Sequence, residues 1–255
     1  MFLIVLLSLF ATCTTAEDKD SALTRLTDID GAETFINSSE VVVIGFFEGE
    51  KSRGYKEFMK AVAEEKSVPI ALCSEKEVWA HYKIESDTIS LFRKVDQFRD
   101  DFKVSEAKKL DSDGISHFIN INDLRYLTEY NQVSAVGLFQ SKVKVHVLLF
   151  VSRGSNDYGR LKKRMRDLAP EYTGKFLFVL INGALQSNAR AMNYFGLKSG
   201  DLPRVGLYDA DLDKRWLMPK GEISTEKVKA FCESYLEGEL QKQKEAGQPD
   251  PKSEL

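Results

Sequence analysis

The chain has 255 residues, a hydrophobic share of 43%, a charged share of 29% and a formal net charge of -3 at pH 7. These shares are typical of soluble globular proteins, and the length is enough for two domains of ordinary size. The small net charge argues against a nucleic-acid-binding protein and against a high-capacity acidic calcium store.

An apolar run begins at Met1, small residues follow it up to Ala16, and the chain then turns abruptly polar. The run is too short to cross a bilayer, which takes about 20 apolar residues. The pattern predicts a signal peptide over residues 1–16, cleaved after Ala16, rather than a buried N-terminal strand. No later segment is long and apolar enough for a membrane helix, so we expect no membrane span.

A first folded unit is expected after a short extension, residues 17–25. Unbroken apolar runs predict strands that are covered on both faces, at 41–47, 68–73 and 89–92. Apolar residues three or four apart predict helices at 55–65, around Val78 and Tyr82, and around Ile115 and Ile119. Asn37 begins a glycosylation sequon. The acidic clusters at 96–101 and 111–113 are expected to be solvated loops.

A second unit repeats this order roughly a hundred residues later. Its predicted strands are 145–151, 176–181, 205–208 and a stretch near 216–218. Its predicted helices are 158–169, 187–195 and one that contains Val228, Phe231 and Tyr235. This order is that of a thioredoxin-like domain. We therefore predict an α/β protein of two tandem thioredoxin-like domains, residues 26–122 and 123–240, each a mixed central sheet flanked by helices.

The last segment, residues 241–255, is polar and contains Gly and Pro, so we expect a flexible tail. It ends in a variant of the Lys-Asp-Glu-Leu retrieval signal, formed by Lys252, Ser253, Glu254 and Leu255. With the signal peptide, this ending predicts residence in the lumen of the endoplasmic reticulum and binding to the retrieval receptor.

Two cysteines, Cys73 and Cys232, remain once Cys13 leaves with the signal peptide. Both lie in apolar patterns and are expected to be small buried residues. The sequence contains no Cys-x-x-Cys, so it lacks the nearby sulfurs that dithiol redox chemistry needs. We therefore expect no enzyme activity and no cofactor.

The three histidines, His81, His117 and His146, show no metal-ligand spacing, and no metal site is expected. His146 opens a predicted buried strand and is expected to be a structural residue with satisfied hydrogen bonds. The basic run 160–166 is expected to be the solvated face of a helix that turns Leu161 and Met165 inward.

Several segments resemble the protein disulfide isomerase family. Residues 39–47 are similar to the opening of its non-catalytic b domain, and His146–Phe150 to the matching strand of its b′ domain. The b′ likeness continues in order at 174–178, 194–198 and 231–238. The chain as a whole is similar to the small non-catalytic endoplasmic reticulum resident members that have only a b–b′ pair, a likeness that 128–131 and 136–139 strengthen.

This resemblance implies non-covalent binding of unfolded or misfolded polypeptides through a hydrophobic pocket in the second domain. It implies that this peptide-binding site contains Tyr130, Phe139, Val143 and Leu197. An unfolded chain is recognised through apolar side chains without a sequence code, so such a site should be a partly exposed apolar groove. The alternative is that these four residues are ordinary core.

The resemblance also implies a cis proline at Pro203, just before a strand, whereas the first domain has Asp87 at the matching position and is interpreted as scaffold. A further implication is recruitment of the thiol oxidoreductase that works with calnexin and calreticulin. The family uses an acidic Glu-Trp-Asp loop for this contact.

The matching segment here is Lys214, Arg215, Trp216 and Leu217, whose cations should repel a basic partner, since like charges across an interface cost several kcal/mol. Either the partner has changed, or Trp216 supplies most of the contact, or recruitment is lost. Two other functions stay open: a structural adaptor without client binding, and an enzyme that uses Cys73 or Cys232 as a lone nucleophile.

Overall fold

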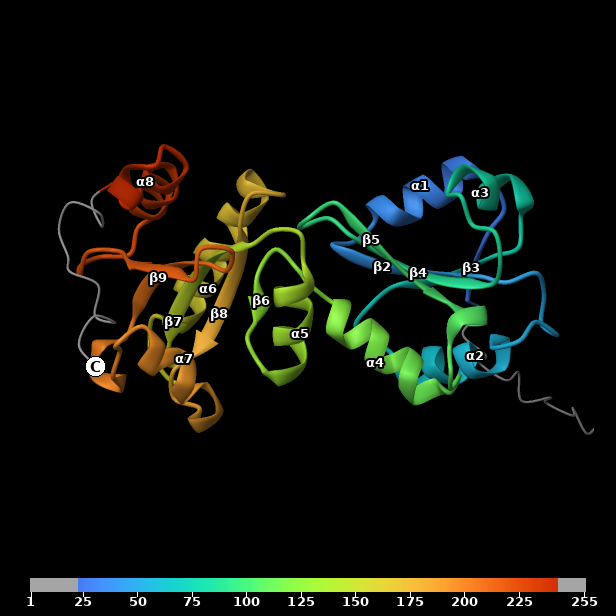
Figure 1. The fold of residues 1–255 in the computed structure, drawn as a ribbon, viewed down its shortest axis with the longest axis horizontal. Helices are drawn as coiled ribbons and strands as arrows, with labels where there is room; N and C mark the ends of the chain where they lie inside the picture. The colour runs from blue at the N-terminus through green and yellow to red at the C-terminus, as the bar shows by residue number, and fades with distance from the viewer. Residues whose placement is uncertain (1–22, 243–255) are drawn as a thin grey trace, which may run out of the picture.

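The structure, a computed structural model, describes residues 23–242, which form two five-stranded sheets arranged one after the other along the molecule (Figure 1). The predicted signal peptide and retrieval signal lie outside the described residues.

The two sheets have the same topology. The first has the strand order β1-β3-β2-β4-β5 and the second the order β6-β8-β7-β9-β10. In each sheet the first three strands in this order are parallel and the last two are antiparallel additions. The strands are β1 (Thr24–Leu26), β2 (Val41–Phe46), β3 (Ile70–Cys73), β4 (Thr88–Arg93), β5 (Phe98–Lys103), β6 (Thr128–Glu129), β7 (Val145–Val151), β8 (Leu177–Asn182), β9 (Arg204–Asp209) and β10 (Lys214–Leu217). The predicted pair of thioredoxin-like domains with mixed sheets is confirmed.

Helices cover both faces of each sheet. In the first domain α1 (Ile29–Asn37) and α3 (Lys76–His81) lie on one face, and α2 (Tyr55–Glu64) and α4 (Ser112–Asn122) on the other (Figure 1). The second domain repeats this with α5 (Gln132–Gln140) and α7 (Ala189–Tyr194) against α6 (Tyr158–Leu168) and α8 (Thr225–Leu236). Short 3-10 helices are η1 (Val104–Glu106), η2 (Ala169–Tyr172), η3 (Gln186–Asn188) and η4 (Ser199–Asp201).

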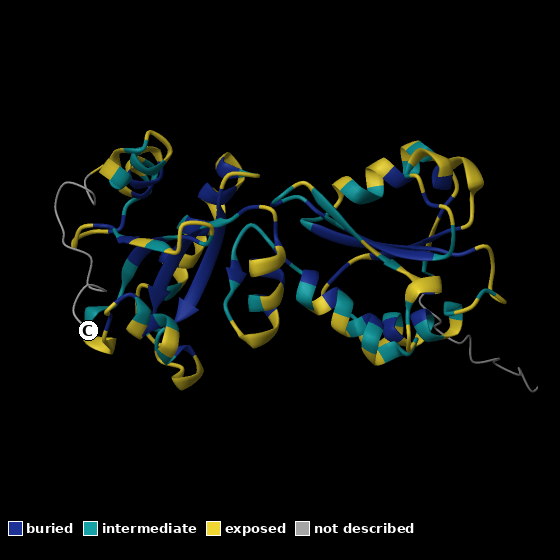
Figure 2. Cartoon of the chain, viewed as in Figure 1, coloured by how far each residue is buried: buried dark blue, intermediate teal, exposed yellow. Residues whose placement is uncertain are grey.

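The core lies on both sides of each sheet, because the central strands are apolar along their whole length. Every residue of β2 is buried, and β7 is buried from His146 onward. Figure 2 shows the central strands in the buried colour, whereas exposed residues lie on the outer faces of helices, in loops and on the outer strands β1, β5 and β10. On α6, Leu161 and Met165 are buried and Lys162 and Lys163 are exposed, as predicted for this basic run. Two of its other cations have partners elsewhere in the protein, because Arg164 donates to the Ile223 carbonyl and Arg166 pairs with Glu40. The Leu202–Pro203 peptide bond is cis, as the resemblance implied.

Three expectations from the sequence were wrong. Residues 98–101 are not loop but part of the edge strand β5, which pairs with β4, because its charged side chains alternate with Phe98 and Phe102. Residues 112 and 113 are not loop either, since they begin α4, which the Asp111 carboxylate caps by accepting from the Gly114 amide at 2.9 Å. Finally, β1 begins at Thr24, inside the segment assigned to an N-terminal extension.

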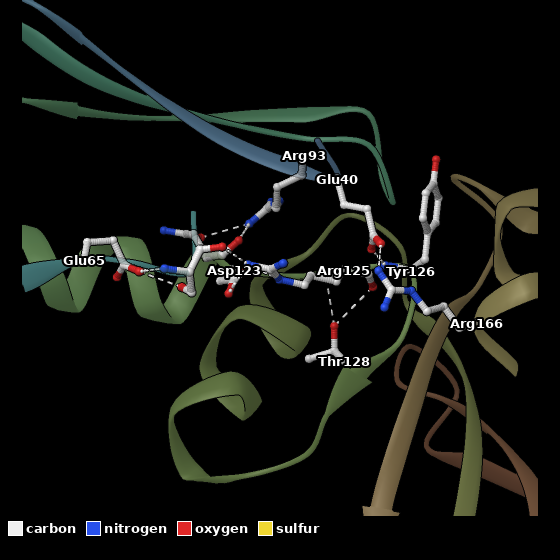
Figure 3. Close-up of polar contacts among 10 residues, drawn as sticks. Glu40, Glu65, Arg93, Asp123, Arg125, Tyr126, Thr128 and Arg166 are labelled. Carbon is white, nitrogen blue, oxygen red and sulfur yellow. Dashed lines mark hydrogen bonds and ion pairs between the residues drawn. The ribbon is translucent and has the colours of Figure 1, made fainter. Parts of the chain in front are cut away.

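Charged side chains join the two domains (Figure 3). The Glu40 carboxylate accepts a hydrogen bond from the Tyr126 amide at 2.7 Å and pairs with the Arg166 guanidinium at 2.6 Å. The Arg93 guanidinium, whose side chain is 2% exposed, pairs with Asp96 at 3.2 Å, and the same Asp96 carboxylate accepts a hydrogen bond from the Ser141 hydroxyl of the second domain at 2.9 Å. Because a broken buried pair leaves a charge without compensation, this network holds the domains in one orientation.

Helix α5 of the second domain packs tightly on α4 of the first. A Cβ atom at Gly137 would lie 1.9 Å from the carbonyl oxygen of Ile121, so only glycine allows this approach. The helix therefore contacts the first domain with one side, and its other side remains for the second domain.

Candidate functional site

A cavity of about 430 Å³ opens on the second domain between α5, α7 and the face of the sheet formed by β7, β8 and β9. Its lining is mostly apolar and aromatic. The described residues that line it are Tyr130, Leu138, Phe139, His146, Leu148, Val179, Ile181, Arg190, Ala191, Tyr194, Phe195 and Tyr208. Cavities of this size and composition are typical of ligand sites in proteins.

The wall formed by α5 is apolar on both of its sides. Asn131 starts the helix by a capping box with Ser134, and the next turns bury Leu138 while Phe139 remains 52% exposed. Val133 and Val136 are exposed as well, at 42% and 38%. An exposed apolar strip beside an open cavity is a common property of surfaces that bind other chains.

The opposite wall depends on a close approach between Phe195 and β9. A Cβ atom at Gly206 would lie 2.7 Å from the Phe195 ring, so glycine lets that ring lie directly on the strand. The ring also packs against Phe150, with centroids 4.9 Å apart. The Phe195 ring is thereby fixed at the base of the cavity.

His146 lines the cavity as a buried polar residue. It is only 4% exposed, and its ring lies between Phe139 and Tyr208, with centroid separations of 6.2 and 6.1 Å. Its Nε2 atom has no hydrogen-bond partner in the described part of the chain. Burial lowers the pKa of His146 to about 4, so the imidazole is neutral at physiological pH. The expectation that this histidine has satisfied hydrogen bonds was wrong at Nε2, which is buried without a partner in the described part of the chain.

Tyrosines and charges form the rim near α7 and β10. The Tyr194 hydroxyl donates to the Asp213 carboxylate at 2.7 Å, and the Arg215 guanidinium lies 4.4 Å above the Tyr194 ring. Burial, together with the hydrogen bond to Asp213, raises the pKa of Tyr194. Burial and the negative charge of Asp213 also raise the pKa of Tyr208. Both tyrosines are neutral hydrogen-bonding groups at the mouth of the cavity.

The four residues named for peptide binding divide into two pairs. Tyr130 and Phe139 line the cavity. Val143 and Leu197 are 7% and 4% exposed and belong to the hydrophobic cluster beneath it. Sequence reasoning missed the other lining residues, which come from α5, β7, β8, β9 and the region of α7, because nothing in a linear pattern shows that they face the same space.

The segment compared with the acidic oxidoreductase-binding loop forms the edge strand β10, of which Lys214 is the first residue and Leu217 the last. Trp216 is 9% exposed, packs against Tyr235 and donates from its indole nitrogen to the Leu240 carbonyl at 3.0 Å. Its ring belongs to the core on the α6 and α8 side of the sheet. Trp216 therefore presents little surface to a partner, which weakens the interpretation that it carries such a contact.

The cysteines are free thiols in separate domains, and both are buried, as predicted. Burial raises the pKa of the Cys73 thiol and raises that of Cys232 to about 12. Since the thiolate is the nucleophile, neither thiol is activated. Among residues 23–242 no cluster of His, Cys, Asp or Glu has the arrangement of a metal site, and no helix there is long and apolar enough to cross a membrane.

The side chain of the sequon residue Asn37 is exposed at the end of α1. It borders a cleft of about 490 Å³ between the domains, together with Lys94, Phe98 and Tyr126. The exposed side chain is accessible to modification, and glycosylation there stays a prediction.

Comparisons with known proteins agree with this architecture. A family model described as a thioredoxin-like domain matches residues 47–234. The chain is 35% identical over 233 residues to endoplasmic reticulum resident protein 27 of Bos taurus, with 91% of this chain and 85% of that protein covered. It is 33% identical to protein disulfide-isomerase of Gallus gallus over 86% of this chain and 42% of that protein. A crystal structure of the bb fragment of ERp72 covers 84% of this chain and 96% of the fragment at 14% identity, with a TM-score of 0.44.

Proposed function

Because the chain belongs to the protein disulfide isomerase family of thioredoxin-like proteins and resides in the endoplasmic reticulum lumen, we propose that it is a non-catalytic member that holds unfolded or misfolded polypeptides. The cavity of the second domain is the proposed binding site. The observation that carries this proposal is the open, mostly apolar lining around one unpartnered polar atom.

His146 gives the proposed site a preference among side chains. A neutral imidazole offers a donor at one ring nitrogen and an acceptor at the other. A buried polar atom without a partner gains free energy when a ligand supplies one. A client tyrosine or tryptophan brings an apolar ring for the cavity and a polar hydrogen for Nε2. We expect these side chains to bind more tightly than phenylalanine.

The proposal that the protein lacks catalytic activity is supported by its thiols. The sequence has no Cys-x-x-Cys, and Cys73 and Cys232 are 2% and 0% exposed. We expect a thiol reagent at neutral pH to label the native protein slowly and the denatured protein quickly. Rapid labelling of the native protein would instead support an enzyme with a lone cysteine nucleophile.

Recruitment of a thiol oxidoreductase is the less supported half of the proposal, because Arg215 and Leu217 replace the acids that flank the tryptophan of the family loop, and Lys214 adds a second cation. A partner that docks on this edge should present an acidic surface. This favours the alternative in which the partner has changed.

A peptide titration tests the client site. The probe is a labelled, cysteine-free unfolded peptide with a single tyrosine, and the readout is fluorescence anisotropy. Ala191→Phe fills the cavity from α7, and we expect it to weaken binding at least tenfold, or about 1.4 kcal/mol. Ala80→Phe on the exposed side of α3 is the matched control, with unchanged affinity. If the parent protein does not bind the peptide, the client-holding function is wrong and a structural adaptor remains.

A further inference from the structure

We propose that the cavity selects client segments in which an acidic residue is adjacent to the side chain that enters it. This inference rests on the proposed function and deepens it by naming a class of client. It follows from the charges around the cavity, which are predominantly positive.

Arg190 provides the first observation. Of the described residues that line the cavity, it is the one that carries a charge at neutral pH, since His146 is neutral there. Its side chain is exposed, and it forms no salt bridge within residues 23–242. Arg190, Ala191 and Tyr194 lie on one face of α7, which places the guanidinium at the mouth and leaves the apolar floor to the entering side chain.

Two further cations lie around the same opening. The Lys144 ammonium donates to the Phe139 carbonyl at 3.0 Å, and its positive charge contributes to the lowered pKa of His146. The Arg215 guanidinium lies over the Tyr194 ring at 4.4 Å.

The opposing charges near this rim are those of Asp213 and Asp209. The Asp213 carboxylate already accepts from the Tyr194 hydroxyl at 2.7 Å and lies 3.4 Å from the Tyr208 hydroxyl, and the buried Asp209 carboxylate acts on Tyr208 and His146. A carboxylate on the client would therefore meet more positive than negative charge at the mouth.

The first domain provides a contrast at the matching position. The two helices can be aligned by a hydrogen bond that follows each of them. The Ile84 amide donates to the Trp79 carbonyl after α3, and the Leu197 amide donates to the Met192 carbonyl after α7. Trp79 therefore matches Met192, and Glu77 matches Arg190. In the first domain, where a packed cluster lies between α1, α3 and the sheet, this position carries a negative charge, and in the second domain, where the cavity opens, it carries a positive one. The change of charge between the two matching positions places a cation beside the cavity.

The test uses three unfolded peptides that share one central tyrosine and differ only in the two flanking residues, which are Glu, Gln or Lys. We expect affinity for the full-length mature protein to decrease in that order, by roughly two- to fivefold per step, the range of exposed ion pairs. The differences should shrink as ionic strength rises, because salt screens exposed charges. The Gln peptide is the neutral reference.

Variants assign the preference to the rim. Arg190→Gln should reduce the Glu-over-Lys preference, and Arg190→Glu should reverse it. Arg160→Gln on the exposed face of α6 is the matched control and should leave the preference unchanged. Equal binding of the Glu and Lys peptides by the parent overturns this inference and leaves the client site intact. Binding of none of the three peptides overturns both the inference and the proposed function.

Discussion

The two domains have the same topology, yet the same space is filled in one and open in the other. In the sheet ladders Phe46 pairs with Thr88, the first residue of β4, and Phe150 pairs with Arg204, the first residue of β9. This equivalence aligns β2 with β7. Between α1, α3 and the first sheet lies a packed cluster that includes Trp79, Tyr82 and Phe92. The corresponding space between α5, α7 and the second sheet is the cavity.

The difference shows that the proposed site arises from smaller side chains at matching positions and not from an additional helix or strand. The alignment matches Val78 with Ala191 and Trp79 with Met192, so α7 carries smaller side chains toward the sheet. The alignment also matches Val42 with His146, so an apolar core position of the first domain becomes the polar atom of the cavity.

The largest effect is expected from a truncation that opens a cavity in the packed cluster of the first domain. Trp79→Ala should lower the free energy of unfolding by about 4 kcal/mol, because it removes a ring that is 2% exposed and donates to the Cys73 carbonyl at 3.1 Å. Urea denaturation checks this. Phe139→Ala, at the 52% exposed cavity wall, is the matched truncation and should cost less than about 1 kcal/mol in stability. Equal losses for the two variants would contradict the contrast between the domains.

The second prediction concerns pH. His146 has a pKa of about 4 in the folded protein against 6.5 for an ordinary histidine, so between these values the unfolded chain binds a proton that the folded chain does not. Stability due to this group is intact above about pH 6.5 and falls as pH falls toward 4, by about 3 kcal/mol. His146→Val restores the first-domain residue type and should remove this part of the pH dependence. Urea midpoints at pH 7, 5.5 and 4 measure it, and parallel curves for parent and variant would refute it.

The smallest expected effect lies at the contact that only one of the two matching helices makes. Gly137→Ala should lower the free energy of unfolding by about 2 kcal/mol, because the added methyl group meets the Ile121 carbonyl oxygen. Gly159→Ala on α6, where a Cβ atom meets nothing within 4 Å, should be neutral or slightly stabilising. Thermal denaturation separates the two variants, and a harmless Gly137→Ala would show that α5 can shift from α4.

Sequence patterns predicted the elements whose side chains repeat with a clear period. The apolar runs of β2 and β7 and the helix stripes of α2 and α6 depend only on local spacing. Helix α5 was missed because it is apolar on both sides, with Leu138 buried and Phe139 exposed. Strand β5 was missed because a run of charged residues is typical of a solvated loop, whereas here Asp100 pairs with Arg93 of the neighbouring strand β4 at 3.0 Å.

The candidate site was only partly predictable for a related reason. Tyr130 and Phe139 were named through resemblance and line the cavity, whereas Val143 and Leu197 lie in the cluster beneath it. Whether an apolar residue reaches a cavity or stops below it depends on how neighbouring helices pack. The open Nε2 of His146 is likewise a property of three strands and two helices together.

Because of the close contact at Gly137, α5 takes part both in the docking of the two domains and in binding at the cavity. One side of the helix abuts the first domain, and its other residues form a wall of the cavity. If the cavity wall moves with α4, the docking of the two domains changes the binding constant of a molecule in the cavity. Thermodynamic linkage then requires that the bound molecule changes the docking equilibrium constant by the same factor. The first domain would in this way change the affinity of its neighbour for a bound molecule.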